Sequence, residues 1–189
     1  MSQEKNAVQP GEEEEKVVLR AVLDEAGVSV PASEDIEGLS SRGYGTPKNG
    51  GLTLTFCEAL YLVSKGIIEV RDQGKIGNLT FQELLEKYRM ANEDAWVRYL
   101  VYRDLRSRGY VVREGFGLGI DFRVYERGEY GKSTADYLIL CIQEGQPVTV
   151  EELARTLRHV QSLKKNLVLS VLNRRGEIVY YSLSEMAFE

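Results

Sequence analysis

Two short runs of almost purely apolar residues constrain the fold of this chain more than any other feature. They are DYLILCI at residues 136–142 and NLVLSVL at residues 166–172. A strand with one solvated face alternates between apolar and polar residues, so a continuous apolar run predicts a strand that is buried on both faces. Two such strands need covering layers on both sides. We therefore expect a mixed β-sheet sandwiched by helices.

Helices that could cover this sheet flank the apolar runs. AWVRYLVYRDLRSRG at residues 95–109 has apolar residues at helical spacing and ends at a glycine, and a capping box of Thr149 and Glu152 opens EELARTLRHVQSLKK. On the first helix we expect Trp96, Leu100 and Leu105 to face inward, and Arg98, Arg103 and Arg106 to face outward. The remaining strands are predicted in YVVRE, IDFRVY and, after the turn NRRGE, IVYYSL.

The N-terminal half predicts a smaller unit. LTLTFCEALYLVSKG begins with strand-like alternation and continues as a helix that stops at Gly66, and Thr80 with Glu83 makes a capping box before FQELLEKYRM. Residues 17–30 fit either strand or short helix. The fold class is thus α+β with an α/β-like C-terminal domain. We expect a disordered acidic tail at 1–15, an N-terminal α+β domain at 16–93 and a C-terminal domain at 94–189.

Composition excludes several classes of protein. The chain has 43% hydrophobic and 28% charged residues, no apolar run of membrane-spanning length and no signal-peptide pattern, so we expect a cytoplasmic globular protein. Its net charge of −5 argues against a protein that coats nucleic acid, although the tail holds five of the glutamates. Cys57 and Cys141 lie in apolar stretches and are expected to be buried and reduced. With one histidine and no C-x-x-C, we expect neither a metal nor another cofactor.

Few residues could carry catalysis. The single histidine, His159, lies within a helix beside no identifiable partner, which favours an ordinary packing role. A metal-dependent nuclease would have to use Asp121, Glu129, Lys132 and Asp136, but they lack the acid-x-lysine spacing of one strand face. The glycines of GFGLG lack the spacing of a phosphate loop and predict a strand-entry turn instead.

Three cations at the end of the second long helix are candidate RNA contacts. The helix dipole explains Lys164 and Lys165, because cations are favourable near the last carbonyls. Arg158 lies about two turns earlier, where it could either stack on an unpaired base or face solvent.

The order of these motifs resembles a known family. The run YLVYRDLRSRGYVVREGFGLGIDFRVYERG, then DYLILCI and LARTLRHVQSLKKNLVLSVLNRRGEIVYY, resembles the C-terminal domain of the archaeal tRNA-splicing endonucleases. RGYGTPKNGGLTLTFCEALYLVSKGIIEV resembles the small N-terminal domain of that family. The resemblance covers the chain from about residue 17. It implies a nuclease-like C-terminal domain and an assembly of four domain pairs that cuts introns from precursor tRNA at bulge–helix–bulge elements without metal.

The resemblance also implies a catalytic set of Tyr, His and Lys. Counting along its motifs assigns the Tyr position to Leu118, the His position to Thr134 and the Lys position to Lys165. Leucine has no ionisable group and threonine is no suitable acid, so the set is incomplete. The chain therefore resembles the structural subunit of a heterotetramer of α2β2 type, whose partner is a catalytic paralogue and whose substrate is precursor tRNA.

The same resemblance implies a subunit interface at the C-terminus. Its expected residues are Arg174, Arg175, Glu177, Ile178, Val179, Tyr180, Tyr181 and Leu183. The last strand could pair at a sheet edge, whereas the preceding turn, usually acidic in the family, here has two arginines and one glutamate. Either Glu177 and the backbone suffice for docking, or the partner carries the acidic loop.

Two other functions stay open. One is a divergent endonuclease that cleaves RNA alone and needs Lys165, His159 and a hydroxyl such as that of Tyr125 or Tyr130 to converge. The other is a free-standing RNA-binding module.

Overall fold

The computed structural model describes residues 18–24, 27–32, 34–74 and 76–186. The acidic tail expected at residues 1–15 lies outside these residues. Within the described ranges, none of the helices is long and apolar enough to cross a bilayer.

The N-terminal half is built around one mixed sheet with the strand order β3-β4-β2-β1-β5-β6. Its elements are β1 (Leu19–Asp24), β2 (Gly27–Val30), α1 (Ile36–Ser41), β3 (Thr46–Lys48), β4 (Gly51–Leu54), α2 (Phe56–Ser64), β5 (Ile68–Asp72), β6 (Asn78–Leu79) and α3 (Phe81–Ala91). The stretch that fitted strand or helix thus contains two strands. β1 pairs parallel with β5, and its Leu19 and Ala21 are buried in the alternating pattern of a strand.

The C-terminal half is a five-stranded mixed sheet with the order β11-β10-β9-β8-β7. Its elements are α4 (Ala95–Ser107), β7 (Val111–Gly117), β8 (Ile120–Tyr125), β9 (Tyr137–Gln143), α5 (Val150–Ser162), β10 (Asn166–Leu172) and β11 (Ile178–Leu183). The apolar runs form β9 and β10, which pair parallel near the middle of the sheet. This confirms two α+β domains with a helix-covered C-terminal sheet.

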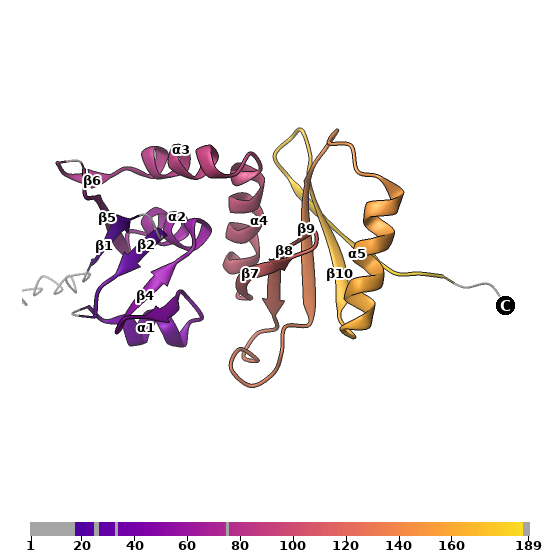
Figure 1. Cartoon of the computed structure of the whole chain (residues 1–189), viewed down its shortest axis with the longest axis horizontal. Coiled ribbons are helices and arrows are strands. Elements are labelled where there is room, and N and C mark those ends of the chain that lie inside the picture. The colour runs from indigo at the N-terminus through magenta and orange to yellow at the C-terminus, as the bar shows by residue number, and fades with distance from the viewer. Residues whose placement is uncertain (1–17, 25–26, 33, 75, 187–189) are drawn as a thin grey trace, which may run out of the picture.

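The two faces of the C-terminal sheet are covered by different helices (Figure 1). On one face, Ile139 and Cys141 of β9 join the core that contains α4. On the other face, Leu138 and Leu167 pack with Val160 of α5 in a separate cluster. The alternation along β9 therefore supplies both cores, as expected for a central strand.

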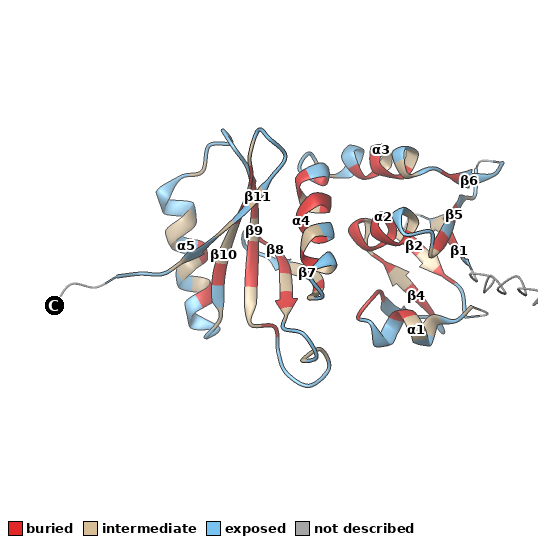
Figure 2. Cartoon of the chain, turned by 180° about the vertical axis from the view of Figure 1, so that it is seen from behind, coloured by how far each residue is buried: buried red, intermediate tan, exposed pale blue. Residues whose placement is uncertain are grey.

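Helix α4 lies between the C-terminal sheet and the N-terminal half, and its buried residues are not confined to one stripe (Figure 2). This position corrects three sequence expectations, those for Trp96, Arg98 and Arg106. Trp96 is 43% exposed, whereas the Arg98 side chain is only 13% exposed because it forms ion pairs with Glu114 and Asp121. Leu100 and Leu105 are buried as expected. Arg106 is half-buried and lies 3.8 Å above the ring of Tyr44.

Polar contacts also join the two halves. Arg113 of β7 donates to the Glu58 carboxylate at 2.8 Å, to the Gly43 carbonyl at 3.1 Å and to the Thr46 hydroxyl at 2.9 Å. Glu58 is 1% exposed, and burial raises its pKa despite the ion pair. The halves therefore share a core and a buried ion pair.

Candidate functional site

One end of the C-terminal sheet brings together residues that are far apart in the sequence. Because β9 and β10 are parallel with Tyr137 opposite Asn166, both strands begin at the same end. The backbone N–H of Asn166 donates to the Asp136 carbonyl at 3.1 Å. Directly before these strands, the Lys165 ammonium donates a 2.6 Å hydrogen bond to the Thr134 hydroxyl. Two of the residues that the resemblance singled out are thus in direct contact.

The end of α5 aims Lys165 at this position. The N–H groups of Lys164 and Lys165 donate to the carbonyls of Gln161 at 2.9 Å and Val160 at 3.2 Å, which is the pattern of a Schellman cap. Lys164 has a φ of 56°, a conformation usually taken by glycine at this point of a helix end. The turn directs Lys164 into solvent and leaves Lys165 half-buried beside Thr134.

Leu118 does not lie at this end. It occupies the β7–β8 turn, where Gly117 pairs with Ile120, whereas the opposite end of β8 meets β9 at Val124 and Tyr137. Ile120 and Val124 are four residues apart, which is roughly 13 Å along a strand. The structure therefore separates Leu118 from Thr134 and Lys165. Within GFGLG, only Leu118 and Gly119 form the predicted turn, because Gly115, Phe116 and Gly117 belong to β7.

Two tyrosines do lie at the Lys165 end. Tyr125 is the last residue of β8, directly after the Val124–Tyr137 pair. Its ring meets the ring of Tyr130 edge-on, with centroids 5.1 Å apart. In the sequence, both tyrosines are candidates only as alternative hydroxyls for a self-sufficient endonuclease. The length of β8 is the signal that favours Tyr125. The loop that carries Thr134 follows the last residue of this strand, which is Tyr125, and lies a full strand away from the turn with Leu118.

His159 lies away from Lys165 and faces the β7–β8 turn. Its ring centroid is 6.0 Å from that of Phe116, at an interplanar angle of 74°. His159 also lines a cavity together with Leu118. The structure therefore does not bring His159, Lys165 and a tyrosine hydroxyl together, which is the convergence that a self-sufficient enzyme of this kind requires. Arg158, its neighbour on α5, is exposed.

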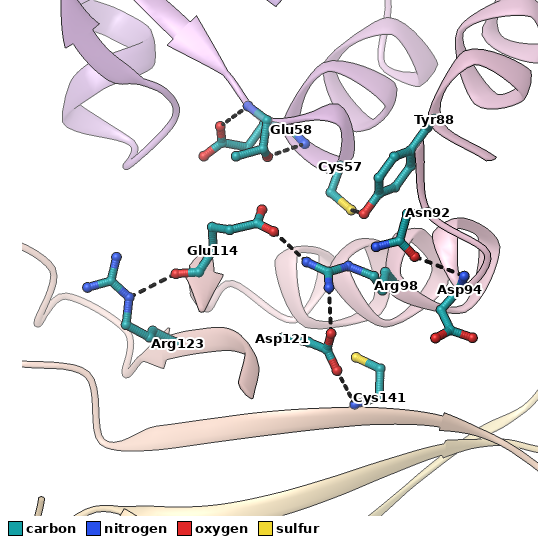
Figure 3. A network of polar contacts seen from close by, with 11 residues as sticks. Cys57, Glu58, Tyr88, Asn92, Asp94, Arg98, Glu114, Asp121, Arg123 and Cys141 are labelled. Atoms are coloured by element: carbon teal, nitrogen blue, oxygen red, sulfur yellow. Dashed lines mark hydrogen bonds and ion pairs between the residues drawn. The ribbon is translucent and has the colours of Figure 1, made fainter. Parts of the chain in front are cut away.

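Of the acids considered for a metal site, Asp121 belongs to a structural ion-pair network (Figure 3). Asp121 contacts Arg98 at 2.5 Å and accepts from the Cys141 N–H at 2.7 Å, while Glu114 binds the same guanidinium. Burial raises the pKa of both carboxyls. Within the described residues, no group of three His, Cys, Asp or Glu side chains could hold a metal ion.

Both cysteines are buried, as the sequence predicted. Cys57 is 1% exposed and Cys141 is 5% exposed. Burial raises the pKa of Cys57 to about 12, and it also raises the pKa of Cys141. A thiol with so little thiolate at neutral pH is a poor nucleophile, so neither residue is a reactive site.

The C-terminal strand β11 is an outer strand of the sheet. Val179 and Tyr181 are 39% and 52% exposed, whereas the half-buried Tyr180 donates to Asp104 at 2.7 Å. In the turn before β11, the side chain of Arg174 is 83% exposed. The strand and turn thus present apolar and basic side chains to solvent.

The Lys165 end can bind an anion but has no evident proton donor. An ammonium and nearby hydroxyls can hold a phosphate and offset its negative charge. General acid catalysis needs a group whose pKa is close to neutrality, and a threonine hydroxyl is no such group. Among the described residues, no histidine lies at this end, because the only histidine of the chain is His159.

Comparisons with known proteins match both halves of the chain. Residues 95–180 match the family model for the tRNA intron endonuclease, catalytic C-terminal domain, and residues 19–85 match the model for its N-terminal domain. A tRNA-splicing endonuclease from Methanococcus vannielii is 35% identical over 168 residues, covering 89% of this chain and 94% of the relative. One from Pyrococcus abyssi is 34% identical over 149 residues, covering 79% and 85%.

Proposed function

The chain belongs to the tRNA intron endonuclease family, and on that premise we propose that it is a non-cleaving subunit of an endonuclease that removes introns from precursor tRNA. One observation carries this proposal. The resemblance assigns the acid position to Thr134, and the only histidine of the chain lies elsewhere, against Phe116. The chain then keeps the scaffold of a cleavage site and leaves cleavage to a catalytic paralogue.

The chemistry explains why one missing group is enough. Cleavage through the neighbouring 2′-hydroxyl needs a base to remove its proton, a cation to offset charge at the phosphorus and an acid to protonate the leaving oxygen. Lys165 can act as the cation. Without an acid, the leaving group departs as an unprotonated alkoxide, and general acid–base catalysis contributes roughly 10²–10⁴-fold to such reactions.

We assign the base position to Tyr125 rather than to Leu118. Tyr125 ends β8 at the same end of the sheet as Thr134 and Lys165, whereas Leu118 belongs to the turn at the other end. Only the acid is then missing.

The proposed RNA contacts are the cations of α5 and its end. Arg158 and Lys164 are exposed and Lys165 is half-buried, so all three can approach a phosphate backbone. Ionic contacts of this kind weaken with rising salt concentration. Binding of precursor tRNA is therefore expected to fall steeply with salt.

The proposed partner surface is β11 with the turn that precedes it. An outer strand offers unpaired backbone groups to the matching strand of another subunit, and Val179 and Tyr181 add apolar area. Arg174 and Arg175 make the turn basic, so we expect an acidic surface on the partner. An α2β2 assembly with a catalytic paralogue would use this surface.

A cleavage assay tests the proposed function. The full chain is incubated with a precursor tRNA that contains a bulge–helix–bulge element, alone and after co-expression with the paralogue. We expect cleavage only when the paralogue is present, and a complex whose mass fits two copies of each chain. Cleavage by this chain alone that is lost in Lys165→Ala would contradict the proposal and support a self-sufficient enzyme. A monomer that binds RNA but ignores the paralogue would indicate a free-standing RNA-binding module.

The interface is tested separately. Tyr181→Lys puts a charge on the exposed face of β11 and should abolish co-purification of the paralogue. Ile76→Lys is the matched control, because Ile76 is fully exposed far from this strand in the N-terminal half.

A further inference from the structure

The β7–β8 turn carries a large apolar residue where glycine would be the usual choice. Gly117, Leu118 and Gly119 have φ values of 86°, 55° and 79°. This left-handed region is disfavoured for a residue as bulky as leucine, and the Leu118 side chain is 66% exposed. Neither backbone preference nor burial accounts for leucine at this position. Such a conformational outlier is a reason to look for a functional role.

Leu118 lines an open cavity of about 760 Å³ beside α5. Arg155, Thr156 and His159 line it from the helix. The volume lies within the range of roughly 300–1,000 Å³ that is typical of ligand pockets. The Nε2 atom of His159 is buried and has no hydrogen-bond partner among the described residues.

An aromatic side chain adjoins the cavity. Phe116 is 47% exposed and meets the His159 ring edge-on. Phe116 and Leu118 are two residues apart at the end of the hairpin, so the turn offers an aromatic ring and an aliphatic side chain together. Flat aromatic ligands stack favourably on such side chains.

The charge beside the turn favours an anionic group. Residues 153–165 of the chain contain no Asp or Glu, and Arg155 and Arg158 in this segment are exposed. Two carboxylates that line the cavity are already engaged, Asp121 by an ion pair and Glu152 in a capping box. Asp94 is the remaining acid in the lining.

We propose that this cavity binds one unpaired nucleotide of the precursor tRNA, with the base against Leu118 and Phe116 and the phosphate toward Arg155. Proteins that bind single-stranded nucleic acid combine base-stacking side chains with cations in this way. The inference rests on the proposed function, because that function supplies the RNA. The site lies at the opposite end of β8 from Lys165, so it is separate from the incomplete cleavage site.

The test uses the full chain and a fluorescein-labelled pentaadenylate RNA with 2-aminopurine at its centre. Anisotropy reports binding, and quenching of 2-aminopurine reports stacking of the central base. We expect the single strand to bind and its 2-aminopurine to be quenched. A duplex of the same sequence, whose bases are already paired, should bind at least about 5-fold more weakly if stacking contributes as it does in other single-strand sites.

Two variants remove the stacking side chains without removing buried groups. Leu118→Asn retains a residue that tolerates the left-handed conformation, and Phe116→Ala shortens a half-exposed ring. Each should weaken binding of the single strand at least about 5-fold and reduce quenching. Val150→Ala is the matched control, because Val150 is 82% exposed on α5, the helix beside the cavity, and does not line the cavity. It should bind like the unchanged chain.

Absence of binding, or equal binding by the unchanged chain and both variants, would overturn the inference. Equal binding of the single strand and the duplex would assign the interaction to phosphates alone and would overturn it as well. The assay involves neither cleavage nor a partner subunit. Its failure is therefore distinguishable from failure of the proposed function, which the cleavage assay reports.

Discussion

The Arg98 guanidinium is held between two carboxylates in a mostly buried environment. It contacts Asp121 at 2.5 Å and also pairs with Glu114, and its side chain is 13% exposed. Sequence periodicity predicted a solvent-facing arginine here. The pattern of one helix could not reveal that acids of β7 and β8 would meet this residue, because they follow it by 16 and 23 positions.

We predict that Asp121→Ala is strongly destabilising. It leaves a largely buried guanidinium with one partner fewer, and removing one member of a buried ion pair typically costs about 3–5 kcal/mol. Equilibrium unfolding in urea measures the change. Glu86→Ala is the control, because Glu86 pairs with Arg89 on an exposed helix face, where such pairs contribute less than about 1 kcal/mol. Similar losses in the two variants would contradict the assignment of Arg98 to a structural network.

Local sequence signals predicted individual helices and strands, whereas the sequence did not predict the register in which neighbouring strands pair. The capping boxes at Thr80 and Thr149 form as predicted, because a capping box depends only on residues three positions apart. The apolar runs predicted the two central strands for the same local reason. The position of Leu118 relative to Lys165 depends instead on how β8 pairs with β9. The sequence of either strand alone does not determine that pairing.

The end of α5 yields a prediction about Lys164. Its φ of 56° is unfavourable for a residue with a side chain and suits glycine. We expect Lys164→Gly to raise the free energy of unfolding by about 0.5–1 kcal/mol, measured in urea. Lys132→Gly, in an exposed loop, is the control and should leave stability unchanged or lower it. If Lys164→Gly lowers the free energy of unfolding as much as Lys132→Gly does, the claim that this turn is strained is refuted.

At the scale of the whole molecule, a glycine lets the two halves approach. Gly43 has a φ of 74°, and a Cβ there would lie 2.4 Å from Val111 Cγ1 of β7 and 3.2 Å from the ring of Tyr130. Tyr130 in turn packs against Tyr125 at the candidate site. The N-terminal half therefore supports the loop that carries Thr134, which no motif in the sequence indicated.

Gly43→Ala is expected to destabilise the chain more than Gly128→Ala. Both glycines have similar φ values of 74° and 79°, but a Cβ at Gly128 would meet nothing within 4 Å. The backbone penalty is thus matched, and overpacking between the halves should add about 1–3 kcal/mol at Gly43. Thermal or urea unfolding of both variants measures the difference. Equal destabilisation would mean that the two halves accommodate the added methyl group at Gly43 without any further loss of stability.

The most direct test of the account is to supply the missing acid. Single-turnover cleavage of a bulge–helix–bulge precursor is measured with the full chain alone, unchanged and as Thr134→His. Because Tyr125 and Lys165 are retained at that end of the sheet, one substitution should complete the set, and general acid catalysis contributes roughly 10²–10⁴-fold. We predict no cleavage by the unchanged chain and cleavage by Thr134→His. An unchanged chain that cleaves alone as fast as Thr134→His would contradict it.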